Sequence, residues 1–290
     1  IPPRAGPRAR KTVRLPSLTR REIVALAVVA AVFAGWLVMP VIRQPQEYHA
    51  FADQRAFLGI PHASDVLSNL ALVAAGLFGL WRTRTTARPL LSVTRASLYI
   101  SFAGMALSGL GSIWYHLAPT DASLVWDRLP MTIAFAGVYG AMFAERISPR
   151  AGAAILAFAL VVGPASVVHW AASGDLSLYL IVQFGLVAGV LLLLVLTRGG
   201  PDALPWGVLL FWYVIAKVAE TADASLWNAT GGLVAGHMIK HVAAAIGGFA
   251  VANALRPTGG RARRAKARDA ARSRAQTSSD SHRTHRDESG

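Results

Sequence analysis

The sequence predicts an all-α integral membrane protein with eight membrane-spanning helices, and two properties of the whole chain support this prediction. Of its 290 residues, 54% are hydrophobic and only 15% are charged, whereas soluble domains carry roughly a quarter charged residues. The chain also contains repeated apolar runs of the roughly 20 residues that a helix needs to cross a bilayer. These runs predict spans at residues 22–42, 64–81, 94–116, 121–145, 151–172, 176–198, 204–222 and 231–255.

The first span, 22–42, follows a basic segment at 1–21. Both the basic leader and the apolar run are long, and no clear small-x-small cleavage site follows them. We therefore expect a retained signal anchor rather than a signal peptide that is removed.

Lysine and arginine fall in alternate loops of this arrangement, which gives the predicted topology. Twenty-four of the 29 occur in five places: seven in 1–21, four in 82–95, two in 146–150, one at Arg198 and ten from Arg256 onward. Basic loops mark the cytoplasmic side of a membrane. We therefore expect both termini in the cytoplasm, as an even number of spans requires, and the pattern fits a bacterial inner membrane.

Residues 256–290 form a polar, basic tail without phenylalanine, tyrosine or tryptophan. The net charge of +14 is a feature of many nucleic-acid-binding proteins, but this tail lacks the aromatic side chains on which bases stack. We expect a disordered cytoplasmic segment that touches anionic lipid headgroups. The sequence predicts no nucleic-acid partner and no protein partner.

The other polar side chains collect at the predicted outer ends of the spans. Ionisable groups at membrane depth cost free energy unless they face an interior cavity and have partners. Convergence of several from different helices favours a functional site over isolated interhelical hydrogen bonds. The residues concerned are His49, His62, His116, His169, His237, His241, Asp53, Asp65, Asp121, Asp127, Asp175, Asp223 and Glu220.

Three segments of this set have the spacing of a metal site. Ser112 and His116 lie four residues apart at the end of one span and therefore share a helix face. Asp127 lies about two turns into the next span, and an antiparallel hairpin would place it at the depth of Ser112. His237 and His241 are again four residues apart, a spacing that lets both imidazoles reach one metal ion.

Structural roles are open for several of these residues. Ser112 could satisfy a backbone carbonyl, and Asp127 could pair with Arg128 or Lys240. Lys217 and Glu220 are three residues apart, so they form either an intrahelical pair or part of a cavity. Lys240 is expected to extend toward the membrane surface or to meet an acidic partner.

The sequence contains no cysteine, so a bound metal ion would be held by histidine, aspartate or glutamate. Three histidines leave a fourth zinc position open for water, as in catalytic rather than structural sites. Asp127 could then orient a ligand or accept the proton of that water, and Ser112 could donate a hydrogen bond to an oxyanion.

The Ser-x3-His motif, the aspartate eleven residues after its histidine and the final HxxxH together resemble the alkaline ceramidases. These are membrane hydrolases of a superfamily that includes the progestin/adiponectin receptors. The segment FADQRAFLGIPHASDVLSNLALV resembles the first-helix entry of the bacterial members, with Asp65, Ser68 and Asn69 matching their pattern. The resemblance covers roughly 50–255, and the joint spacing of its motifs is specific.

This resemblance implies a seven-helix zinc hydrolase core at 43–255 and an extra transmembrane helix at 22–42. The implied zinc ligands are His116, His237 and His241, with Ser112 and Asp127 as catalytic residues and the site toward the outer face. The implied activity is zinc-dependent cleavage of the amide bond of ceramide-like membrane lipids to a fatty acid and a sphingoid-type base. One alternative is a zinc-containing lipid-binding or receptor-like protein without turnover. A proton or ion transporter has less support, because the polar residues cluster on one side of the membrane.

The sequence does not favour the calcium site that the ceramidases carry before their first core helix. This stretch offers only Glu47, Asp53 and Asp65, and His62 stands where the family pattern places an acidic ligand. We expect Asp53, Asp65 and Asn69 to bind a second cation or to brace the zinc site.

Overall fold

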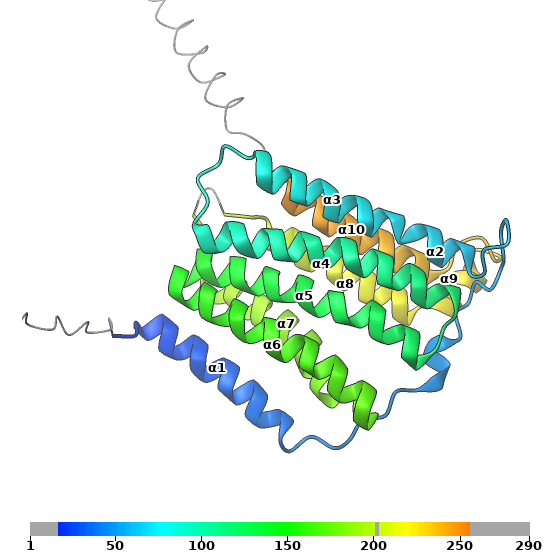
Figure 1. Ribbon diagram of the computed structural model, residues 1–290, viewed down its shortest axis with the longest axis horizontal. Helices are drawn as coiled ribbons and strands as arrows, with labels where there is room; N and C mark the ends of the chain where they lie inside the picture. Colours follow the sequence, from blue (N-terminus) through cyan, green and yellow to red (C-terminus); the bar gives the residue numbers. More distant parts are fainter. Residues whose placement is uncertain (1–16, 201–202, 256–290) are drawn as a thin grey trace, which may run out of the picture.

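The structure is a computed structural model that describes residues 17–200 and 203–255. These residues are all-helical and form no β-strand; two isolated bridges join Arg43 to Asp175 and Phe57 to Ile60. Figure 1 shows the long helices packed side by side as a bundle. The elements are α1 (Arg20–Trp36), η1 (Gln46–His49), α2 (Ala63–Ser68), α3 (Leu70–Thr85), α4 (Ser92–Leu117), α5 (Asp121–Arg146), α6 (Pro149–Ser173), α7 (Ser177–Leu196), α8 (Trp206–Thr221), α9 (Asp223–Ala229) and α10 (Gly236–Ala254).

Within the described residues, four helical stretches are long and apolar enough to cross a membrane by length and composition, which is consistent with a membrane protein. They are Ala63–Thr85, Ser92–Leu117, Pro149–Ser173 and Ser177–Leu196. The predicted count of eight spans is not confirmed. Helices α1 and α8 have only 17 and 16 residues, which is shorter than the roughly 20 of a typical span. Helices α5 and α10 carry charged and imidazole side chains that lower their hydropathy.

Two predicted spans differ from single continuous helices at the end of the bundle that carries the polar residues. Residues 64–81 contain two helices, α2 and α3, which meet at Asn69. The predicted span 231–255 becomes helical only at Gly236, because Gly231 and Gly232 adopt positive φ values of 63° and 79° and interrupt the helical path. The short helix α9 precedes them, and the sequence did not predict it.

Small residues let α4 and α5 pack in close contact. A Cβ atom placed on Gly111 would lie 1.9 Å from the carbonyl oxygen of Trp126, and one placed on Gly104 would lie 2.4 Å from the nitrogen of Ala134. Glycine permits such a close approach between helix backbones because it has no Cβ atom. This contact fixes the register of the hairpin and brings Ser112 of α4 to the level of Asp127 of α5.

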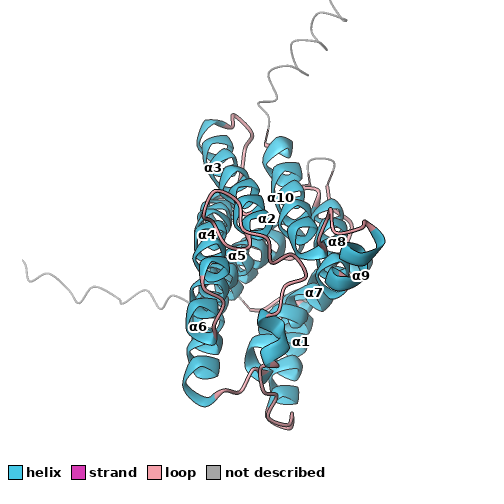
Figure 2. Ribbon diagram, turned by 90° about the vertical axis from the view of Figure 1, so that its right-hand side faces the viewer, coloured by secondary structure: helices cyan, strands magenta, loops and turns pink. Residues whose placement is uncertain are grey.

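Helix α1 lies at the edge of the bundle, beside α6 and α7 (Figures 1 and 2). Phe33 stacks edge-on against Phe158 with ring centroids 5.1 Å apart, and the indole of Trp36 donates to Ser177 over 3.0 Å. At the start of the helix, Glu22 accepts a hydrogen bond from Arg150 at 2.6 Å. The described part of the predicted segment 1–21 begins at residue 17, and the predicted tail 256–290 lies outside the described residues.

The connector between α1 and α2 runs across the end of the bundle where α2, α9 and the start of α10 lie (Figure 1). Asp223 accepts a hydrogen bond from the amide of Ala52 at 2.9 Å, and His49 contacts Asp121 at 3.1 Å. These contacts bring Phe51, which is 4% exposed, into the interior of the bundle. The connector therefore forms a cover over the polar end of the helices.

Candidate metal centre

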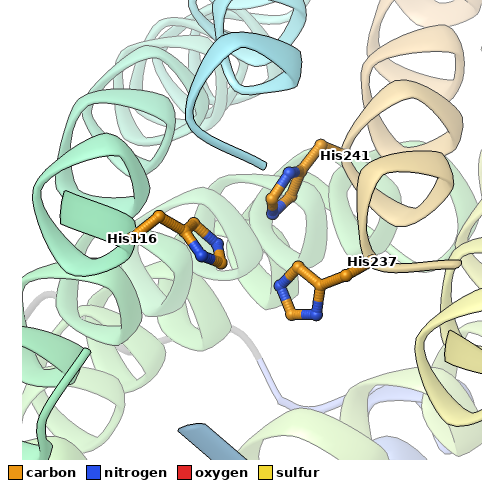
Figure 3. A group of neighbouring side chains, drawn as sticks. All are labelled: His116, His237 and His241. Carbon is orange, nitrogen blue, oxygen red and sulfur yellow. The ribbon is translucent and has the colours of Figure 1, made fainter. Parts of the chain in front are cut away.

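Three histidines from two helices face one another at the polar end of the bundle (Figure 3). His116 lies in the last turn of α4, and His237 and His241 lie in the first two turns of α10. One ligand atom from each ring lies within 4.8 Å of the others. The ring centroids are 4.9 to 5.2 Å apart, and all three side chains are buried. This group could hold a metal ion.

Ring nitrogens without a hydrogen-bond partner are available in this group as metal ligands. Both ring nitrogens of His116 and Nε2 of His241 are buried without a hydrogen-bond partner in the part of the chain that the structure describes. A buried polar atom without a partner costs about 1–3 kcal/mol, and such atoms are rare in folded proteins. The convergence of these ring nitrogens on one point is therefore better explained by a metal ion that they bind together than by packing alone.

Neighbouring groups hold the first two turns of α10 and their histidines in place. The Ser68 hydroxyl lies 2.8 Å from Nδ1 of His241, which leaves Nε2 as the ligand atom. Asp223 accepts a hydrogen bond from the backbone amide of His237 at 2.7 Å. A Cβ atom on Gly236 would lie 2.1 Å from the carbonyl oxygen of Ala219, so glycine permits α10 to begin against α8. Such partners of ligand residues set ring orientation in metal sites.

Phe51 covers the histidines from the connector. Its ring lies 4.5 Å from that of His116 and 4.7 Å from that of His237, centroid to centroid. His62, a further histidine in the same region, does not join the group; its Nδ1 contacts the backbone oxygen of His116 at 3.0 Å. The site is thus closed on one side by an aromatic side chain.

A network centred on Glu220 lies next to the histidines. Lys240 contacts Glu220 at 3.0 Å and Nε2 of His237 at 2.8 Å, and the Tyr48 hydroxyl donates to Glu220 over 3.1 Å. Lys217 also forms an ion pair with Glu220. Lys217 and Glu220 therefore form the predicted intrahelical pair, and both also line the cavity described below. Lys240 meets an acidic partner.

Ser112 and Asp127 lie together at the polar end of one cavity, as the hairpin register predicts. The Ser112 hydroxyl is within hydrogen-bonding reach of the Asp127 carboxylate, and both side chains are buried. Among the ion pairs of the described residues, Lys240 pairs with Glu220 and none joins Asp127 to Arg128. The structural alternative for Asp127, a direct pair with Arg128 or Lys240, is therefore not what the described residues form.

The cavity has a volume of about 370 Å³ and opens between α4, α5, α7, α8 and α10. One end is polar, and its lining includes Ser112, Asp127 and His241. The rest of the wall is mainly apolar, with side chains such as Met105, Phe135, Val187 and Leu209. An apolar chamber with a polar end suits an amphiphilic molecule such as a lipid.

The remaining predicted residues, Asp53, Asp65 and Asn69, are buried but differ in their partners. Asp53 accepts two hydrogen bonds from the Arg55 guanidinium, at 2.9 and 2.7 Å, and one from Ser64 at 2.7 Å. The Arg55 hydrogen bond lowers the pKa of Asp53 to about 2. The carboxylate oxygens of Asp65 and the amide oxygen of Asn69 have no hydrogen-bond partner within residues 17–200 and 203–255.

Sequence reasoning missed Phe51 and assigned no specific role at this site to Asp223 or Arg128. Phe51 covers the histidines, Asp223 binds the start of α10, and Arg128 lines the cavity as a buried cation. A polar residue before the last predicted helix was a signal for Asp223, whereas nothing in the local pattern singles out Phe51. Arg128 was interpreted only as a partner for Asp127.

Comparison of the chain with protein-family models and with curated proteins finds no match. The resemblance to the alkaline ceramidases therefore rests on the motif residues and their spacing. The activity that it implies is a proposal.

Proposed function

We propose that this protein is a zinc-dependent membrane hydrolase that cleaves the amide bond of a ceramide-like lipid. The observation that carries the proposal is the group of three buried histidines, two of which have ring nitrogens without a hydrogen-bond partner among the described residues, beside the polar end of an apolar cavity. Its donors are His116, His237 and His241, and its neighbours in the cavity are Ser112 and Asp127. No other arrangement of the described polar residues combines metal ligands with a lipid-sized chamber.

The donor set supports zinc as the metal. Zinc in catalytic sites is commonly bound by three protein ligands, with histidine nitrogen among the preferred donors, while calcium and magnesium prefer oxygen. When bound, zinc activates a water molecule and polarises the carbonyl to be attacked.

The chain's own residues would transfer the proton, stabilise the oxyanion and bind the acyl chain. Asp127 accepts a proton from the attacking water and delivers it to the nitrogen of the leaving amine as the C–N bond breaks. Ser112 donates a hydrogen bond to the carbonyl oxygen, on which negative charge develops. The apolar wall of the cavity holds the acyl chain, so the lipid can be bound without leaving an apolar environment.

The proposal includes a finer membrane arrangement. A seven-helix core at 43–255 follows an extra transmembrane helix at 22–42, giving eight crossings with both termini in the cytoplasm and the histidines toward the outer face. The alternate placement of basic loops supports this topology, as does the gathering of histidines and acids at one end of the bundle. A bacterial inner membrane is the expected location.

The test is metal content and lipid hydrolysis in the detergent-purified protein and in His237→Ala. We expect one zinc per chain in the wild type, with both zinc and fatty-acid release from a ceramide panel lost in the variant. His169→Ala is the matched control, because His169 contacts Asp175 and is 38% exposed, away from the three ligands. It should retain zinc and activity.

Two results would contradict parts of the proposal. Zinc bound without hydrolysis of any amide on the panel would favour a lipid-binding or receptor-like protein. Full turnover by a folded His237→Ala variant that contains no zinc would refute the metal-dependent mechanism.

A further inference from the structure

Arg128 is a buried cation in the cavity, and it forms no ion pair with a carboxylate of the described residues. Its side chain is 4% exposed, and it lines the cavity beside Asp127. Nη2 donates to the side-chain oxygen of Gln44 at 2.6 Å, while Nη1 is buried and has no hydrogen-bond partner among the described residues. A guanidinium placed inside a bundle is costly unless its hydrogen bonds and charge are met.

Aromatic rings hold this guanidinium in a fixed position. Its central carbon lies 4.3 Å from the ring centroid of Trp170, 4.8 Å from that of Tyr179 and 5.4 Å from that of Tyr48. Contacts with aromatic faces stabilise a cation and restrict its plane. They do not satisfy the free N–H groups of Nη1, which need an oxygen acceptor.

The charges that line the cavity leave one positive charge in excess. Three cations, Arg128, Lys217 and Lys240, face two carboxylates, Asp127 and Glu220. Both lysines form ion pairs with Glu220, whereas no ion pair of Arg128 occurs among the described residues. Arg128 is therefore the cation of this cavity whose hydrogen-bonding capacity, at Nη1, is left for a ligand.

We propose that Arg128 forms an oxyanion subsite in the cavity and that the lipid bound there carries an acidic group. Nη1 would donate to a carboxylate or phosphate oxygen at the polar end of the lipid, and the apolar wall would hold its chain. The part of this inference that concerns the reaction rests on the proposed function and changes its expected substrate. The preferred substrate is a lipid amide with an acidic head, such as an N-acyl amino acid, rather than a neutral ceramide.

The binding test uses two ethers of the same length that contain no amide, dodecyloxyacetate and dodecyloxyethanol, with dodecyl phosphate as a second anion. Affinities are measured by calorimetry on the full chain in a neutral detergent at pH 8. We expect the wild type to bind dodecyloxyacetate about tenfold more tightly than the alcohol, as a charge-assisted hydrogen bond provides. The ratio for dodecyl phosphate distinguishes a carboxylate head from a phosphate head.

Arg128→Gln should reduce this preference to threefold or less. Arg43→Gln is the control, because Arg43 is an exposed arginine that bonds to the backbone of Ser173 and does not line the cavity. It should keep the tenfold ratio. If Arg128→Gln does not fold, Arg128→Lys decides the question, since a single ammonium cannot serve Gln44 and the ligand in the same geometry. Equal binding of both ethers by the wild type, or an unchanged ratio in a folded Arg128 variant, would overturn the subsite.

A turnover test separates this inference from the proposed function. N-dodecanoylglycine should be hydrolysed at least tenfold faster, by kcat/KM, than N-dodecanoylethanolamine, and Arg128→Gln should remove the difference. Equal hydrolysis of both amides would leave the hydrolase standing and overturn the acidic-substrate inference. Hydrolysis of neither, together with binding of dodecyloxyacetate that depends on Arg128, would overturn the hydrolase and support the subsite alone.

Discussion

Both ring nitrogens of His116 and Nε2 of His241 are buried and have no hydrogen-bond partner among the residues that the structure describes. The centroid of the His237 ring lies 4.9 Å from that of His116 and 5.0 Å from that of His241. Three neutral imidazoles gain little from one another in an apolar interior, since buried polar atoms are stabilised mainly by the hydrogen bonds or metal bonds they make. The fold keeps these atoms directed at one point. This arrangement is more informative about function than the presence of the histidines in the sequence.

Asp127→Asn tests the role of the carboxylate without changing its shape. We expect the variant to keep its metal, because Asp127 is not one of the three converging donors, and to lose about 10²–10⁴-fold in turnover, which is the typical contribution of a general base. Metal per chain and the rate of lipid-amide hydrolysis are the measurements. Asp121→Asn is the control, since Asp121 is 49% exposed and contacts His49. A rate for Asp127→Asn equal to that of the wild type would remove Asp127 from the mechanism.

Asp53 predicts a dependence of stability on pH that is separate from turnover. Its pKa is lowered to about 2 by the Arg55 guanidinium, so the ion pair contributes stability above the ordinary carboxyl pKa and loses it as the pH falls toward 2. Because Arg55 is half exposed, we expect Asp53→Asn to cost on the order of 1 kcal/mol at pH 7. Thermal unfolding at pH 7 and pH 3 should show the gap between variant and wild type shrinking at the lower pH. A gap that stays constant would assign the effect to packing.

Some site residues could be predicted from the sequence and others could not, because only some of them are related by local helix geometry. His237 and His241 share a helix face by their spacing, and His116 and Asp127 are related by a short hairpin, so local geometry was sufficient. Phe51 reaches the histidines only through a connector that bonds to Asp223 of a distant helix. Contacts of this kind depend on the tertiary fold and have no periodic signature in the chain.

At the scale of elements, the α4–α5 hairpin sets the distance between catalytic candidates. Gly111→Ala places a Cβ atom 1.9 Å from the Trp126 carbonyl oxygen, so the helices must separate next to Ser112 and Asp127. We expect a loss of about 1–3 kcal/mol in stability, as for overpacked cores, together with reduced turnover at unchanged metal content. Thermal unfolding and hydrolysis rates test this.

Gly207→Ala is the matched control for that substitution. A Cβ atom at Gly207, in the first turn of α8, meets nothing within 4 Å. Alanine should therefore leave stability unchanged or raise it slightly, because alanine is the better helix former. Equal behaviour of the two variants would refute the close-packing argument.

Helix positions followed from apolar length, but the turns between them depended on single glycines. Predicted ranges such as 94–116 and 121–145 coincide with α4 and α5 within a few residues. Helix α9 and the late start of α10 were not predicted, because the positive φ of Gly231 and Gly232 interrupts an otherwise apolar run. The run alone could not indicate that its first residues are outside the helix.

At the scale of the whole molecule, the bundle has two chemically different ends. Basic side chains join helix ends at one of them: Arg146 donates to Thr197 at 2.8 Å, and Arg88 donates to Ala254 at 3.2 Å. The other end holds the histidine group, Asp121 and Asp223, and the connector runs across it (Figure 1). This separation agrees with basic loops on one side of a membrane and a site near the other.

The chain has no cysteine, so single introduced cysteines can test whether this polarity is a membrane topology. Ser17, Ala56 and Ala87 are exposed and lie before α1, between α1 and α2, and between α3 and α4. If both intervening stretches cross the bilayer, Ala56→Cys should react with an impermeant maleimide added to intact cells. Ser17→Cys and Ala87→Cys should react only after permeabilisation. Labelling of Ser17→Cys from outside, with Ala87→Cys protected, would mean that the 17-residue α1 does not cross and that the extra helix lies on the membrane surface instead.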